Sequence, residues 1–213
     1  MKKTAHCIEQ EESMNSDEYR KVMDNRRSIY EITDKSPITN AQIEELVADA
    51  VVATPSAFNS QGAEVLLLFG EESDKLWDIV LETLKQRVPA EKFQATADKI
   101  ASFKAGYGTI LYFEDTAIVD NLMKAFPLYA DNFPMWSQQA NGMLQINIWQ
   151  LLEANGLGAS LQHYNPLIDA EVKKTWDIPD SWRLLAEMPF GEIVSVPEPK
   201  NKKPVSERMK VFG

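Results

Sequence analysis

The chain has 213 residues, 44% of them hydrophobic, and carries a formal net charge of −10. This length suits one domain with a sizeable core, and the negative charge disfavours nucleic acid or an anionic membrane as a partner because like charges repel. A single cysteine, Cys7, excludes a disulfide within the chain, and the sequence has neither the ~20-residue apolar run of a membrane span nor the apolar segment of a secretory signal, so we expect a cytoplasmic protein.

Residues 1–15 are polar and lack periodicity, and we expect a flexible N-terminal extension ahead of one domain over residues 16–213. The first predicted helix spans residues 17–25. A second helix is expected to begin with a capping box of Thr39 and Gln42 and to carry apolar residues at helical spacing. It should end near Thr54, because Pro55 disfavours a helical residue before it.

Alternating strands and helices are predicted for the rest of the domain. Short apolar runs predict strands at residues 64–69, 109–113, 157–162 and 182–188, and residues 192–196 continue the last strand after Pro189. Helical patterns lie at residues 74–88, 90–104, 117–126, 137–155 and 169–176. Residues 137–155 are apolar nearly all round, which predicts a central buried helix. Strands separated by helices indicate layers of helix and sheet.

The first candidate binding segment follows the first helix and contains Arg26, Arg27, Ser28 and Tyr30. A guanidinium offers a planar fork of donors that matches phosphate oxygens, a serine adds a further hydrogen bond, and an aromatic ring can pack on another flat ring. Alternatively, the two arginines cap helix carbonyls or face solvent, as exposed charges commonly do.

A second candidate segment, residues 55–61, contains Pro55, Ser56, Ala57, Asn59 and Gln61. Its short hydroxyl and amide side chains can serve both the donor and the acceptor edges of a polar, planar ligand. The alternative is an ordinary connecting loop, since loops favour these residue types.

A third candidate segment spans residues 156–166, where small residues let a backbone approach a flat ligand closely. Within it, His163 is either a hydrogen-bonded residue at a strand end or a catalytic base, for which the sequence identifies no orienting carboxylate. No group of His, Cys and Asp has the spacing of metal ligands, and neither of the two common glycine-rich nucleotide motifs is present. The C-terminal tail carries five basic residues, which are either solvated or a second set of phosphate donors: Lys200, Lys202, Lys203, Arg208 and Lys210.

In this order the segments resemble the FMN-dependent nitroreductase family. The matches are Arg26-Arg27-Ser28, then Pro55-Ser56 with Asn59-Ser60-Gln61, then Gly156-Leu157-Gly158-Ala159-Ser160, and the basic tail. Residues 162–166 and 207–212 are similar to a branch called the fatty acid repression mutant proteins, which are small oxygen-insensitive nitroreductases. The resemblance covers residues 16–213.

The resemblance implies an α+β fold in which helices wrap a central mixed β-sheet, and an obligate homodimer with two FMN sites at the subunit interface. It implies that Arg26, Arg27 and Ser28 contact FMN, with Tyr30 close by. The segment containing Pro55, Ser56, Ala57, Asn59 and Gln61 would reach in from the partner. Leu161, Gln162 and His163 would line the ring edge, and Lys203 and Arg208 would add phosphate charge, with Lys202 as an alternative to Lys203.

The function implied is an oxidoreductase in which NADH or NADPH reduces FMN and a nitroaromatic or quinone then reoxidises it by a ping-pong mechanism, with a role in stress response. The flavin carries the redox chemistry, so no catalytic side chain is expected. A competing hypothesis is a non-catalytic flavin-binding regulator in lipid signalling. A third is an acidic helical adaptor without a cofactor. Turnover of NAD(P)H separates the first two, and the yellow colour of bound flavin separates both from the third.

Overall fold

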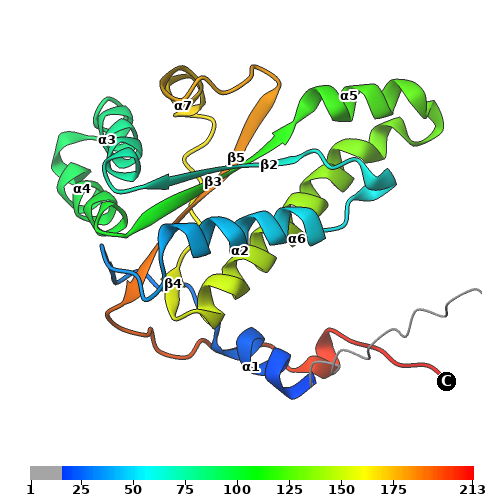
Figure 1. The fold of residues 1–213 in the computed structure, drawn as a ribbon, viewed down its shortest axis with the longest axis horizontal. Coiled ribbons are helices and arrows are strands. Elements are labelled where there is room, and N and C mark those ends of the chain that lie inside the picture. Colours follow the sequence, from blue (N-terminus) through cyan, green and yellow to red (C-terminus); the bar gives the residue numbers. More distant parts are fainter. Residues whose placement is uncertain (1–15) are drawn as a thin grey trace, which may run out of the picture.

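The computed structural model describes residues 16–213, and its centre is a five-stranded sheet. The strands are β1 (Ile32–Thr33), β2 (Ala63–Phe69), β3 (Gly108–Asp115), β4 (Leu157–Ala159) and β5 (Trp182–Ile193). They run in the order β1-β5-β3-β2, and β4 also pairs with β5 (Figure 1). The four ladders of the sheet are antiparallel, and an isolated parallel bridge outside the named strands joins Ser28 to Ala159.

Helices cover both faces of this sheet. On one face, α2 (Asn40–Ala53) and α6 (Phe133–Ala154) pack against the side chains of Tyr112 and Met188. On the other face lie α3 (Glu71–Lys85), α4 (Ala90–Lys104) and α7 (Asp169–Thr175). The helix α5 (Thr116–Ala125) leads through a short 3-10 segment, Pro127–Asn132, into α6. The predicted α+β arrangement of a sheet wrapped by helices is therefore confirmed.

Local sequence signals account for several element ends. At the start of α2, the Gln42 amide N–H donates to Thr39 Oγ1 at 3.3 Å, and the Thr39 N–H donates to Gln42 Oε1 at 3.0 Å. This reciprocal pair is the predicted capping box. The helix ends at Ala53, with Thr54 as the cap before Pro55. By contrast, β5 runs through Pro189 without a break, and the Pro189 carbonyl accepts a hydrogen bond from Ser160.

The helix α6 differs from its prediction in two respects. It begins at Phe133, four residues before the predicted start, with Pro134 in its first turn, where a proline is well tolerated. One side of the helix is buried through residues such as Leu144 and Ile148, whereas Met143 and Ile146 on another side are 40% and 36% exposed. The predicted central buried helix is thus buried on one side in the single chain, and no element among residues 16–213 covers the side of Met143 and Ile146.

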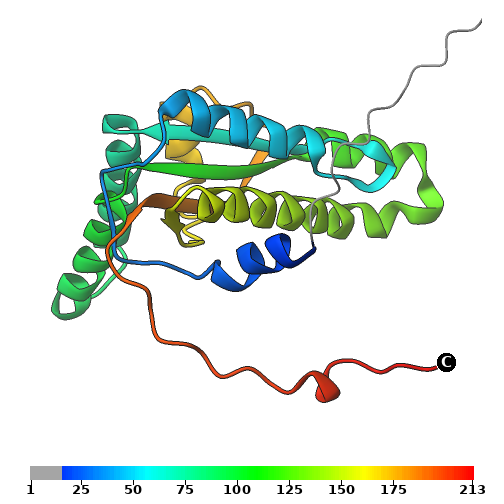
Figure 2. The ribbon, with the colours of Figure 1, turned by 60° about the horizontal axis from the view of Figure 1, so that its bottom comes forward.

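The two ends of the described chain lie on the same side of the domain, beyond α6 from the sheet (Figure 2). The first helix, α1 (Ser16–Asn25), packs beside α6, and the tail after β5 runs past α1 as an extended segment (Figure 2). The tail is attached where the Val194 N–H donates to the Glu31 carbonyl at 2.9 Å, and every side chain from Lys200 onward is exposed. No helix within residues 16–213 combines the length and the apolar character that crossing a bilayer requires. The predicted flexible extension, residues 1–15, lies outside the described residues.

Candidate functional site

The segment after α1 lies directly against β4. Ser28 forms the parallel bridge with Ala159, and the Ile29 N–H donates to the Ala159 carbonyl at 2.9 Å. Gly158 permits this approach, since a Cβ there would stand 2.9 Å from the Cβ of Ile29 and 2.8 Å from Ile193. Two of the segments singled out from the sequence are therefore brought side by side.

The two arginines of this segment have different surroundings. The Arg26 guanidinium lies over the Trp149 ring of α6, 4.4 Å from its centroid, a cation–π contact. Burial lowers the pKa of Arg26, although the Glu153 carboxylate opposes this shift. Arg27 instead donates to the Glu198 carbonyl at 2.8 Å and so joins the segment to the tail. The pair thus connects α6 and the tail.

Residues 55–61 form a shaped turn. The Gln61 N–H donates to Ser56 Oγ at 2.9 Å, and Phe58, Asn59 and Gln61 all have positive φ angles of 51–58°. This conformation is uncommon for residues other than glycine, and it is least favourable for a bulky residue such as Phe58. A pocket of about 310 Å³ lies against the turn and is lined by Pro55, Ser56, Asn59 and Gln61 together with Ala140 and Leu144 of α6.

Aromatic packing holds this turn in place. The Phe58 ring lies 4.8 Å from that of Phe126, 5.3 Å from that of Phe133 and 6.2 Å from that of Trp136, measured between centroids. Aromatic pairs at such distances stabilise a fold by about 0.5–1.5 kcal/mol each beyond their buried area. These contacts can offset the strained backbone of the turn, whose shape is therefore fixed by the corner between α5 and α6.

The segment after β4 contains Leu161, Gln162 and His163. Leu161 packs against the core beneath α2 and α6. Gln162 is buried, and its amide donates to Ser160 Oγ at 3.0 Å. His163 is exposed and lines a pocket of about 460 Å³ with Gln138, Gly142, Gln145, Asn165 and Arg183.

One flank of α6 connects these features. Gln138, Gly142, Gln145 and Trp149 are spaced by four, three and four residues, which places them on one flank of the helix. Trp149 carries Arg26 at one end, and the pocket with His163 lies at the other, about 16 Å away for eleven helical residues. We call this flank the α6 groove. Gly142 adds no side chain to this flank, and a Cβ at that position would face open space, with no atom of residues 16–213 within 4 Å.

The remaining predicted residues lie elsewhere in the single chain. Residues 55–61 contact Ala140 and Leu144, which lie on the opposite flank of α6 from the groove. Lys203 and Arg208 are exposed in the tail, and Tyr30 is exposed at the end of residues 26–30, which we call the groove segment. The chain therefore brings Arg26, Arg27 and Ser28 together with residues 159–163, and it does not add the turn or the tail cations to them.

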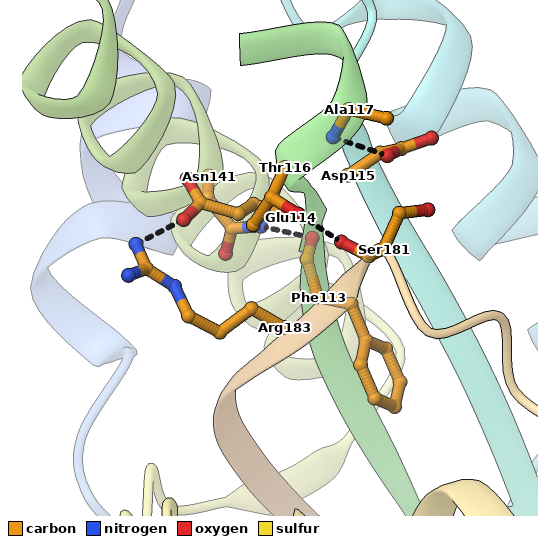
Figure 3. A network of polar contacts seen from close by, with 8 residues as sticks. All are labelled: Phe113, Glu114, Asp115, Thr116, Ala117, Asn141, Ser181 and Arg183. Atoms are coloured by element: carbon orange, nitrogen blue, oxygen red, sulfur yellow. Dashed lines mark hydrogen bonds and ion pairs between the residues drawn. The ribbon is translucent and has the colours of Figure 1, made fainter. Parts of the chain in front are cut away.

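A polar network, drawn in Figure 3, includes Arg183, which also lines the pocket that contains His163. The buried Glu114 carboxylate pairs with the Arg183 guanidinium, and the Asn141 amide donates to the Phe113 carbonyl at 2.8 Å. Gln145 in turn donates to Asn141 Oδ1 at 2.8 Å. These contacts fix Arg183 and Gln145 at the wall of the pocket.

Sequence reasoning missed Glu187, a carboxyl group on β5 that is 0% exposed. Its backbone N–H donates to the Gln162 carbonyl at 3.0 Å, and its own carbonyl accepts from the Gln162 N–H at 2.7 Å. The available signal was an acidic residue between Ala186 and Met188, inside a mostly apolar strand. Among residues 16–213 no cluster of three or more His, Cys, Asp or Glu side chains could hold a metal ion.

Comparisons with known proteins agree with the fold and with the segments. The chain matches the Nitroreductase family over residues 23–192. HBN1 of Saccharomyces cerevisiae is 34% identical over 184 residues, which is 85% of this chain and 91% of that protein, and nitroreductase FRM2 of the same yeast is 29% identical over the same shares. Nitroreductase CinD from Lactococcus lactis, solved in complex with chloramphenicol, is 42% identical, with a TM-score of 0.84 over 92% of this chain and all of that one.

The resemblance inferred from the ordered motifs is thereby confirmed, and so is the similarity to the branch that includes FRM2. The matched residues contain the groove segment, the turn at residues 55–61 and the segment after β4, and they end at the last strand. The match of the whole fold to CinD agrees with a nitroreductase-type oxidoreductase. The chain therefore belongs to the nitroreductase family.

Proposed function

We propose that the protein is an FMN-dependent NAD(P)H oxidoreductase that reduces nitroaromatic or quinone compounds in the cytoplasm, with a role in stress response. The observation that carries the proposal is the α6 groove, which holds guanidinium and hydroxyl donors at one end and a polar pocket about 16 Å away at the other. A flavin mononucleotide has a matching division into a dianionic phosphate and a flat ring.

The residues present fit such a ligand. Arg26, Arg27 and Ser28 would bind the phosphate end through charge-assisted hydrogen bonds, and Tyr30 would pack close by. The amide edge of the ring would face Gln162 and His163, beside the backbone of Leu161. Gly142 leaves the space that a flat group needs against a helix. When bound, FMN supplies the hydride transfer between NAD(P)H and the oxidant.

The chain's own residues would bind, orient and shield the cofactor. The pairing of Gln162 with Glu187 fixes the segment against which the ring would lie. Donors aimed at a ring edge stabilise negative charge that develops there during reduction. The structure of CinD has been solved with 4-nitrophenol as well as with chloramphenicol. This supports the proposal that the present protein uses a nitroaromatic oxidant. A non-catalytic flavin-binding regulator would use the same residues without NAD(P)H turnover.

Purified protein is expected to carry FMN and to bind it more tightly than riboflavin, because riboflavin lacks the phosphate that the arginines would hold. The measurement is identification of the released flavin, followed by titration of apoprotein with each flavin. Oxidation of NAD(P)H in the presence of 4-nitrophenol then tests the enzyme against the regulator. Equal affinity for FMN and riboflavin would mean that the arginines do not bind the phosphate.

We also propose a homodimer in which the turn of each subunit completes the groove of the other. The support is that the turn lies on the far flank of α6 from the groove, while Met143 and Ile146 between them are exposed. Apolar side chains uncovered on a central helix are typical of an interface between subunits. Lys203, or Lys202 in its place, and Arg208 would add phosphate charge from the tail.

Flavin-loaded protein should therefore be a dimer by light scattering at micromolar concentration, and dissociation should release the flavin. Replacing Ile146 with Glu places a charge in the proposed interface and is expected to yield a monomer without flavin. Replacing Glu44 with Lys, an exposed change on α2 away from that side, is the matched control. A monomer that keeps its flavin contradicts the proposed dimer.

Replacing Gly142 with Ala separates stability from binding. Alanine is favoured over glycine inside a helix by about 1 kcal/mol, and the new Cβ meets no atom of the described part of the chain. The apoprotein should therefore unfold at a higher temperature, while its affinity for FMN falls because the methyl group occupies the groove. Thermal denaturation of apoprotein and flavin-fluorescence titration measure the two effects. Unchanged flavin affinity would mean that the groove does not hold the ring.

A further inference from the structure

The buried carboxyl group of Glu187 has no role in the function proposed so far. It is 0% exposed, and its Oε2 accepts a hydrogen bond from the Tyr164 N–H at 3.0 Å. Together with the two backbone bonds to Gln162, this makes three hydrogen bonds from one residue to the segment 162–164. His163, at the polar end of the groove, lies between the two residues that Glu187 holds.

Three buried oxygen atoms in this region lack a hydrogen-bond partner among the described residues: Glu187 Oε1, Asp169 Oδ1 and Asn165 Oδ1. All three are acceptors when the carboxyl groups are ionised, so none can satisfy another. A buried acceptor without a donor destabilises a fold by about 1–3 kcal/mol. One proton on Glu187 turns its Oε1 into a donor, which can serve one of the other two oxygens and so reduces this conflict.

The surroundings of Glu187 favour its protonated form. Burial raises the pKa of Glu187 to about 8, and the negative Asp169 adds to the rise, whereas the Tyr164 N–H opposes it. Burial also raises the pKa of Asp169, but Lys173 and Arg183 lower it. Tyr164 has a pKa of about 12 through burial and the nearby Glu187, so it stays neutral. Lys173 and Arg183 favour the ionised form of Asp169. Of the two carboxyl groups, Asp169 is therefore the ionised one and Glu187 the protonated one.

We propose that Glu187 is a positioning residue that holds a proton at neutral pH, shares it with Asp169, and so keeps segment 162–164 in the shape that binds flavin. The link to flavin rests on the proposed function, whereas the shared proton does not. Ionisation of Glu187 buries a negative charge that the nearby negative charge of Asp169 disfavours, and so loosens the segment. Flavin binding therefore depends on a group that does not touch the flavin.

The first test uses apoprotein and measures unfolding against pH in wild type and in Glu187→Gln. Because the pKa of Glu187 is higher in the folded protein than the ordinary value of 4.5, the folded state binds the extra proton between about pH 4.5 and pH 8. Its stability is greatest below that window and falls as pH rises through it. The neutral glutamine lacks this dependence. Between pH 5 and pH 9 the unfolding constant of wild type should rise, relative to the variant, on the order of 10³-fold.

The second test measures FMN affinity at pH 7 and pH 9. In wild type, a tenfold excess of the ionised form at pH 9 should weaken binding by about tenfold. Glu187→Gln should bind like wild type at pH 7 and keep that affinity at pH 9, since the amide retains a donor and an acceptor. Asp169→Asn removes one of the two negative charges and supplies an amide donor in its place, so this variant should keep its FMN affinity at pH 9.

Different failures have different meanings. An unfolding constant whose ratio between wild type and Glu187→Gln stays constant from pH 5 to pH 9 overturns the shared proton. Loss of flavin by Glu187→Gln at every pH, as expected for Glu187→Ala, overturns the positioning role and leaves an ordinary structural one. A protein that shows the pH-dependent stability but binds no FMN supports the shared proton and rejects the flavoenzyme.

Discussion

Replacing Arg27 with Ala is expected to weaken FMN binding by roughly 10- to 150-fold. A hydrogen bond to a charged group contributes about 1.5–3 kcal/mol, which corresponds to that range in affinity. The substitution also removes the 2.8 Å bond to the Glu198 carbonyl, so the tail loses its attachment beside the groove. Titration of apoprotein with FMN, followed by flavin-fluorescence quenching, gives the affinity. With excess FMN the turnover should recover, since the phosphate end lies far from the reacting ring.

Arg87 provides a matched control, because its guanidinium also donates to a backbone carbonyl at 2.8 Å, that of Thr83 at the end of α3. Arg87→Ala should change flavin affinity by less than about twofold, as is usual for an exposed charge. Arg208→Ala is expected to behave like Arg27→Ala if the tail reaches the phosphate. If neither Arg27→Ala nor Arg208→Ala binds FMN more weakly, these residues are not phosphate ligands, even in a protein that proves to be yellow.

The largest expected loss of stability follows from replacing Gly191 with Ala. A Cβ at this position would collide with the Thr33 carbonyl oxygen and would stand 3.1 Å from the Tyr107 nitrogen. Both are backbone atoms of the sheet, so β1 and β5 must separate to admit the methyl group. Overpacking of this kind destabilises a protein by about 3 kcal/mol. For a domain of this size, the melting temperature should fall by about 6–12 °C.

Gly62→Ala is the control for this change, because a Cβ there would meet Ile118 at an ordinary contact distance of 3.5 Å. Its melting temperature should stay within a few degrees of wild type, measured by circular dichroism on apoprotein. Gly191 also lies opposite Gly158 in the ladder between β4 and β5, so Gly191→Ala should disturb the groove segment and reduce flavin binding. Equal melting temperatures for both variants would mean that β1 moves aside without cost.

The fold could be predicted where the signal is local. The capping box at Thr39 and the apolar runs of β2 and β3 depend on neighbouring residues, and their elements formed close to the expected positions. The two-residue strand β1 could not be predicted, because it exists only through its pairing with Glu192 and Ile193 far along the chain. The predicted start of α6 lies four residues too late, and the additional first turn contains Pro134, at a position where a helix accommodates proline.

The site was predictable as a set of segments and only partly as an arrangement. The sequence motifs identified Arg26 and His163, but their position at two ends of one flank of α6 comes from the packing of α1 and β4 on that helix. Glu187 escaped notice because a lone acidic residue in a strand carries no motif. Its significance depends on Tyr164 and Asp169, which only the fold brings near it.

The ring contacts of Phe58 have a consequence for redesign of this protein. Phe58 joins the turn at residues 55–61 to the rings of Phe126, Phe133 and Trp136. In a library that varies the turn alone, every variant must still pack against these three unchanged rings. Substitutions within such a contacting group are not additive. Engineers seeking new substrate scope should therefore randomise the turn and the α5–α6 corner together, as one mutational unit.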